Sequence, residues 1–226
     1  MRTFILLLLL AFTASTAQAQ APPHVVVANG GIFNDATAPP NLEIRTPGGM
    51  QFYTDTVGTG SVQDVLVVDN RVYLAADDSL IGYNLATEQR LGAVEIGGVY
   101  RLAYWQGQIL VAESFGYAAG EATFEAYDAD DLSFIYGINE ADDELGGMAI
   151  VQDTAYLSYN RAFGENSDSL LVIDLANQSF VEWIDLGLTD AKVGEMAASG
   201  DSLLAIASGE GQLVNYNTQA NTTSTY

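Results

Sequence analysis

Residues 62–98 read VQDVLVVDNRVYLAADDSLIGYNLATEQRLGAVEIGG. The stretch holds four short runs rich in apolar, β-branched and aromatic residues, separated by polar segments such as Asp-Asn and Asp-Asp-Ser. Short runs of this kind, bounded by turn-forming residues, are typical of antiparallel β-strands. The stretch therefore predicts a four-stranded antiparallel meander.

The rest of the chain repeats this unit. Five second strands align on their first apolar residues, which are separated by 47, 37, 46 and 48 positions: Val25, Val72, Ile109, Ala155 and Leu203. Another apolar residue stands seven positions before four of these anchors: Val65, Leu102, Met148 and Met196. The constant offset predicts a first strand, a two-residue turn such as Asp69-Asn70 or Gly200-Asp201, and a second strand.

A repeated meander of about 40–50 residues has the size of a β-propeller blade. The sequence predicts an all-β propeller with about five blades, bounded approximately at 24–61, 62–98, 99–144, 145–191 and 192–226. A β-sandwich is the alternative, and the constant register favours the propeller. The first unit begins at its second strand and the last lacks a full fourth strand. We therefore expect an open or incomplete ring from a C-terminally truncated sequence, or a closed five-blade ring with an incomplete seam.

The first 19 residues are expected to be a secretory signal peptide. Arg2 provides a positive charge, Phe4–Phe12 is a short apolar run, and Ala17-Gln18-Ala19 fits a cleavage site. The apolar run is too short for a membrane span. The domain prediction is therefore a signal peptide over 1–19 and a propeller over 20–226, in a secreted protein.

The composition excludes several classes of function. The chain has no cysteine, which excludes disulfides, thiolate metal sites and a cysteine nucleophile. Its net charge of −22 disfavours binding to nucleic acid and to anionic membranes. The single histidine, His24, makes a Ser-His-Asp triad or a His-ligated zinc site improbable. The acidity is typical of a soluble protein, or of one that binds divalent cations.

Two repeat units resemble a known family. SLIGYNLATEQRLGAVEIGG (79–98) and SLLVIDLANQSFVEWIDLG (169–187) are similar to the strand–turn–strand signature of YVTN-type, YncE-like secreted propellers, to which quinoprotein-like propellers are related. The tryptophan-rich repeat of the quinoprotein propellers and the WD40 signature are absent. The resemblance implies a propeller in the envelope of a bacterium, in the periplasm or on the outer cell surface, and implies no particular activity.

The repeat register predicts where ligands would bind. The residues just before the first-strand anchors should surround the central channel at one level: Asp64, Arg101, Gly147 and Glu195. An arginine between carboxylates could orient a polar ligand, or it could form a structural ion pair between blades. The ends of the second strands should face the same side: Asn29, Asp77, Glu113, Tyr159 and Asn160. Tyr100, Tyr104 and Trp105 lie on a first strand and are expected in the core.

Calcium is the one metal that the acidic turns allow. Asp128–Asp131 and Asp142–Glu144 offer oxygen ligands without the spacing of an EF-hand. Because solvated acids are common at turns, we expect no cofactor, with calcium as a less favoured alternative.

The sequence therefore predicts a monomeric secreted propeller that binds a protein, peptide or glycan at its loop face and is not an enzyme. The alternative is a propeller enzyme, a quinoprotein-like dehydrogenase or lactonase-like hydrolase, with a divalent cation in the channel.

These two hypotheses differ in their response to chelation. A resident channel cation stabilises the folded state by mass action, so its removal by EDTA should lower the melting temperature. The binding-module hypothesis predicts the same melting temperature with EDTA and with added calcium, measured by differential scanning fluorimetry. An unchanged melting temperature would contradict the metal-enzyme alternative.

Overall fold

The structure is a computed structural model that describes residues 25–30, 40–46, 49–53, 61–87, 89–114, 123–141, 144–160, 168–188, 192–208 and 211–226. The expected signal peptide, His24 and Asp142-Asp143 lie outside these residues. Among the described residues, no helix is long and apolar enough to cross a membrane.

The described strands form five antiparallel blades. Blade I comprises β1 (Val25–Asn29), β2 (Asn41–Thr46) and β3 (Gly49–Tyr53). Blade II comprises β4 (Asp64–Val68), β5 (Arg71–Ala75), β6 (Asp77–Asn84) and the first half of β7 (Gln89–Trp105). Blade III comprises the second half of β7 with β8 (Gln108–Glu113), β9 (Phe124–Asp128) and β10 (Phe134–Ile138).

The last two blades are separate four-stranded sheets. Blade IV comprises β11 (Glu144–Val151), β12 (Thr154–Asn160), β13 (Ser169–Asp174) and β14 (Ser179–Asp185). Blade V comprises β15 (Lys192–Ser199), β16 (Ser202–Ser208), β17 (Gln212–Asn217) and β18 (Thr222–Thr225). The predicted all-β fold of four-stranded antiparallel blades is confirmed.

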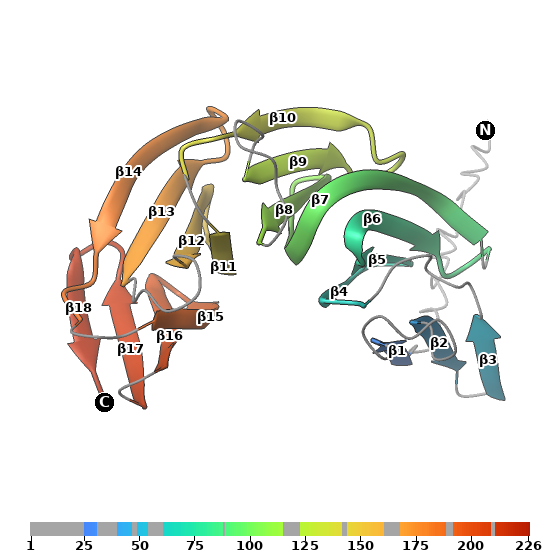
Figure 1. Cartoon of the computed structure of the whole chain (residues 1–226), viewed down its shortest axis with the longest axis horizontal. Coiled ribbons are helices and arrows are strands. Elements are labelled where there is room, and N and C mark those ends of the chain that lie inside the picture. Colours follow the sequence, from blue (N-terminus) through green and yellow to red (C-terminus); the bar gives the residue numbers. More distant parts are fainter. Residues whose placement is uncertain are drawn as a thin grey trace, which may run out of the picture.

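Figure 1 shows the blades standing along an arc, with the first strands on its inner side and the fourth strands on its outer side. Blades I and V occupy the two ends of the arc and do not lie side by side, so the described residues form an open rather than a closed ring. This agrees with the predicted open or incomplete ring rather than with the closed five-blade alternative.

The junction between blades II and III differs from the sequence prediction in detail. The expected boundary at residues 98/99 falls inside β7, which runs for 17 residues and joins both blades in one seven-stranded sheet. Gly98 of β7 has a φ of 76°, a conformation that glycine adopts without strain. The register of β7 against β8 then shifts between Val99 and Arg101.

The turns between first and second strands are the predicted two-residue turns. Each begins with a residue of positive φ: Asp69 (52°), Gln106 (45°), Gln152 (56°) and Gly200 (60°). Positive φ suits the right-handed twist of a tight hairpin. Asp69 and Gly200 are turn-forming residues from which the sequence predicted these turns, whereas Gln106 and Gln152 do not indicate a turn.

A second recurring contact explains the Asn or Asp that ends each third strand. The side-chain oxygens of these residues accept backbone N–H groups two or three positions later, in Asn84, Asp128, Asp174 and Asn217. The following residues donate their N–H groups to the carbonyls of the first hairpin turn at 2.7–2.9 Å: Leu85, Ala129, Leu175 and Thr218. The repeat in the sequence is therefore a repeat of hydrogen bonds that tie the third strand to the first turn.

The hydrophobic cores lie between blades rather than within them. Leu42 and Ile44 of blade I pack with Val72 and Leu74 of blade II. The other three described clusters join blades II and III, III and IV, and IV and V in the same way. Burial of one such side chain contributes about 1.5–3 kcal/mol, so each blade depends on its neighbours for stability.

Blades IV and V approach each other closely at Gly147. A Cβ atom at Gly147 of β11 would lie 2.5 Å from the carbonyl oxygen of Gly194 and 3.0 Å from the Cα of Glu195. The Ser158 hydroxyl donates to the same Gly194 carbonyl at 3.3 Å. The backbones of β11 and β15 can pass at this distance because position 147 has no side chain.

Replacing Gly147 with alanine should therefore destabilise the protein by about 1–3 kcal/mol, because backbone atoms must shift to admit the methyl group. Gly92→Ala is the matched control, since its Cβ would lie 3.7 Å from Leu132 in ordinary contact. We expect this control to change stability by less than about 0.5 kcal/mol. Urea unfolding measures both variants, and equal stability of the two would contradict the close approach.

Candidate functional site

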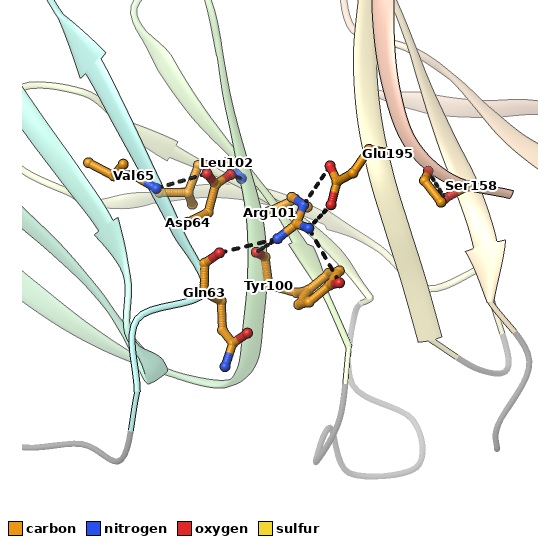
Figure 2. A network of polar contacts seen from close by, with 9 residues as sticks. Gln63, Asp64, Val65, Tyr100, Arg101, Leu102, Ser158 and Glu195 are labelled. Atoms are coloured by element: carbon orange, nitrogen blue, oxygen red, sulfur yellow. Dashed lines mark hydrogen bonds and ion pairs between the residues drawn. The ribbon is translucent and has the colours of Figure 1, made fainter. Parts of the chain in front are cut away.

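The inner ends of the first strands bring three of the predicted residues together. Figure 2 shows Asp64 of β4, Arg101 of β7 and Glu195 of β15 converging on one region, from blades II, III and V. Gly147, the fourth residue of the predicted set, lies on β11 against the backbone of Glu195. The repeat register thus places these positions at one level.

Bulges aim the side chains of this region. The register shifts at equivalent places in β7, β11 and β15: between Val99 and Arg101, between Leu145 and Met148, and between Val193 and Met196. A bulge adds an unpaired residue, bends the strand and turns side chains away from the regular alternation. Arg101, Gly147 and Glu195 all lie within or beside these bulges.

Arg101 uses all of its donors within the protein. Its Nε donates to Glu195 Oε2 at 3.1 Å, and one terminal nitrogen, Nη2, donates to the other Glu195 oxygen and to the Tyr100 hydroxyl at 3.3 Å. The second terminal nitrogen, Nη1, donates to the carbonyls of Gln63 and Tyr100 at 3.2 and 3.1 Å. An arginine has five N–H groups, so these five bonds leave none for a ligand.

The surroundings of Arg101 hold the guanidinium in place. Its central carbon lies 4.0 Å from the centre of the Tyr100 ring, which is a cation–π distance. The Arg101 side chain is 17% exposed, whereas that of Glu195 is 59% exposed. Arg101 is therefore a fixed member of the site, and Glu195 presents its carboxylate to solvent.

Asp64 joins blades II and III through the backbone. One carboxylate oxygen accepts the N–H of Leu102 at 2.9 Å, and the other accepts the N–H of Val65 at 2.8 Å. The Gln63 carbonyl, one residue earlier, accepts from Arg101. Both bonds thus run from donors on blade III to acceptors on blade II, and the ion pair extends this contact to blade V.

The ends of the second strands do not form one solvent-facing group. Glu113 is 2% exposed and Tyr159 is 7% exposed, and Tyr159 packs in the cluster between blades III and IV. Tyr159 also meets Trp183 edge-on, with ring centres 5.0 Å apart. Asn29 is exposed at the end of β1, while the side chains of Asp77 and Asn160 lie outside the described residues.

The carboxylates of Glu113 and Glu125 affect the pKa of the neighbouring Tyr127. Burial, the hydrogen bond that the Tyr127 hydroxyl donates to Glu125, and the nearby charge of Glu113 raise the pKa of Tyr127. Tyr127 therefore stays protonated and acts as a donor. This arrangement stabilises the interface of blades II and III rather than presenting a reactive group.

Sequence reasoning missed the contribution of Tyr100, which was expected in the core and instead stacks on Arg101. Tyr104, also expected in the core, is 41% exposed, whereas Trp105 packs against the cluster of blades III and IV and donates to Asp153 at 3.1 Å. The bulge beside Arg101 interrupts the alternation on which the prediction relied.

The acidic turn at Asp128–Asp131 has a structural explanation. Asp128 and Asp131 accept backbone N–H groups from Asp130 and Ser133, and Asp130 pairs with Arg71 at 2.5 Å. The hydrogen bonds from Ser133 lower the pKa of Asp131. Within the described part of the chain, no three Asp, Glu or His side chains gather as metal ligands would.

Solved structures with the same architecture identify the fold. The chain superimposes on the WD40 repeats of RRP9 with a TM-score of 0.62 at 14% identity, covering 88% of this chain and 56% of that one. U3-55K gives 0.61 at 15% identity, covering 73% and 51%, and the designed Ika8 protein gives 0.62 at 11%, covering 84% and 58%. The fold is a β-propeller. The chain spans about half the length of these structures, no family model matches it, and no curated protein matches it significantly.

Substitutions at Arg101 and Glu195 should separate two contributions to stability: the ion pair itself, and the bonds of Arg101 to backbone carbonyls and to the Tyr100 ring. We expect Arg101→Ala to lower the free energy of unfolding by about 2 kcal/mol, because it removes several bonds of a charged, mostly buried group. Glu195→Gln should cost less than about 1 kcal/mol, because exposed ion pairs contribute little. Lysine at 101 should not restore stability, since one ammonium cannot replace the planar fork.

Urea unfolding measures these differences. Arg45→Ala is the control, because the exposed Arg45 pairs with Glu43 only two residues away on the same strand and should matter much less. Equal losses for Arg101→Ala and Glu195→Gln would show that the ion pair, rather than the backbone and ring contacts, carries the stabilisation.

Proposed function

We propose that this protein is a secreted, non-enzymatic binding module, of the YVTN-type and YncE-like kind that its repeats resemble, in the envelope of a bacterium. As a monomer it would bind a protein, peptide or glycan at its loop face, on the inner side of the arc where Asp64, Arg101 and Glu195 converge. The fold supports a scaffold role, because a propeller presents the loops and strand ends of several blades on one face.

The observation that carries this proposal is the saturation of Arg101. With the five Arg101 donors used internally, the most accessible charged group of the site is the carboxylate of Glu195, which is an acceptor. Acceptors select ligands that donate: lysine and arginine side chains, or the hydroxyl groups of a glycan. A net charge of −22 adds long-range attraction for basic ligands and repulsion for nucleic acid.

Selection from a random displayed peptide library, together with a glycan array, tests this proposal. We expect selected peptides to be enriched in Lys and Arg, or the bound glycans to be neutral or cationic. Glu195→Gln should weaken the best ligand about tenfold, which corresponds to about 1.4 kcal/mol. Binding is measured by isothermal titration calorimetry on the full chain.

Glu182→Gln is the matched control, because Glu182 is an exposed carboxylate on β14 at the outer side of blade IV. This variant removes the same charge and should leave affinity unchanged. Selected ligands that bind Glu195→Gln as tightly as the wild type would overturn the assignment of the site. If Glu195→Gln and Glu182→Gln weakened binding equally, the loss of affinity would come from the change in net charge rather than from contact with Glu195.

A further inference from the structure

Blade I has three strands where blades IV and V each have four. Its innermost strand is β1, which pairs with β2 on one side. Among the described residues, no strand pairs with the other edge of β1, on the inner side of the arc (Figure 1). An open strand edge is a template for pairing with another chain.

The neighbouring blade carries an apolar side chain that such a strand would cover. The first-strand anchors Leu102, Met148 and Met196 all pack in or against inter-blade clusters. Val65, the equivalent anchor of blade II, belongs to none of the described clusters and is 37% exposed, compared with 8% for Leu102. Leu102 packs beside Leu66 and Val68 of the preceding first strand, β4. Val65 lacks this cover because blade I has no described first strand.

Val65, rather than Val67, shows the effect of the uncovered face of blade II. Val67, two residues later on the same face, is 49% exposed, but its equivalent Tyr104 in blade III is also exposed, at 41%. Among the described residues, Val65 is therefore the anchor that no neighbouring first strand covers.

The open edge and the exposed valine belong to one surface. Val26 and Ala28 of β1 pack against the cluster on blade II, and a Cβ at Gly30 would lie 3.6 Å from the carbonyl oxygen of Val62. The end of β1 therefore lies against the segment that enters β4. A strand added to the open edge of β1 would lie over β4 and meet Val65.

The charges around this surface favour one kind of occupant. Asp64 and Asp69 flank the apolar residues of β4, and the chain carries a net charge of −22. Two copies of so acidic a chain repel each other, whereas a basic partner is attracted. We propose that the inner edge of β1 binds an extended segment of a partner protein by strand addition, and that this segment alternates small apolar residues and has basic residues at its ends. Backbone hydrogen bonds would give affinity, and contact with Val65 would give specificity.

The test measures binding of a labelled peptide to the full chain. The peptide has three Val-Thr repeats flanked by a lysine at each end. Hydrogen exchange should show rapid exchange of those amides of residues 25–28 that point away from β2 in the free protein, and protection of the same amides when the peptide is bound. Fluorescence anisotropy should show about tenfold weaker binding to Val65→Lys, which corresponds to about 1.4 kcal/mol. Val181→Lys on β14, at a valine that is 49% exposed, should bind as the wild type does.

Further comparisons separate this surface from the site at Arg101. Glu195→Gln should bind the peptide normally, so the two proposals can fail independently. A peptide with proline in place of its central valine should not bind, because proline cannot pair within a ladder. The proposal is overturned if Val65→Lys binds normally, if a glutamate-flanked peptide binds equally well, or if the amides of residues 25–28 that point away from β2 are protected in the free protein by its own chain. A concentration-dependent dimer in light scattering would overturn it in favour of a second copy.

Discussion

A sheet that is apolar on both faces cannot bury either face by itself, and this constraint governs the whole molecule. Each described cluster is shared by two successive blades, so the stability of one blade depends on the placement of the next. The recurrent bonds from the residue after each Asn or Asp to the first hairpin turn fix the register inside a blade. Burial between blades then fixes how the blades stack.

The centre of the arc adds a second constraint, because inner strands have the least room. The absence of a side chain at Gly147 allows β11 and β15 to approach closely, and the Arg101–Glu195 pair connects blades III and V at the same place. The guanidinium also bonds the Gln63 carbonyl of blade II. One side chain therefore contacts three blades, which explains why its donors are all used within the protein.

The repeat made the fold and part of this site predictable. The anchors at Val72, Ile109, Ala155 and Leu203, with the apolar residue seven positions earlier, specify two strands and a turn in each unit. The same register placed Asp64, Arg101 and Glu195 at one level. These features depend on local spacing, which a single sequence displays directly.

The remaining features depend on one-residue shifts that spacing does not reveal. A bulge beside Arg101 removes Tyr100 from the regular alternation, so a tyrosine expected in the core stacks on the guanidinium. The burial of Glu113 depends on the neighbouring blade, and the continuity of β7 depends on the backbone at Gly98. Each needs tertiary geometry that no pattern of apolar residues contains.

The two ends of the arc are built differently, and this difference bears on where partners would attach. On blade V, the residues that alternate with the core positions Leu203, Val214 and Tyr216 include the polar Ser202, Asn215 and Asn217 but also Leu204 and Leu213, and Leu213 is 43% exposed. The outer face of blade V is therefore mixed, whereas a capping repeat that keeps a repeat array soluble has a polar outer face. On blade I, the residues that alternate with Val26 and Ala28 include Val25 and Val27, which are 56% and 39% exposed. Apolar surface that remains exposed on so acidic a chain is typical of an interaction surface. Exposed apolar residues occur at both ends of the arc, and we expect strand addition at blade I because it has only three described strands where blade V has four.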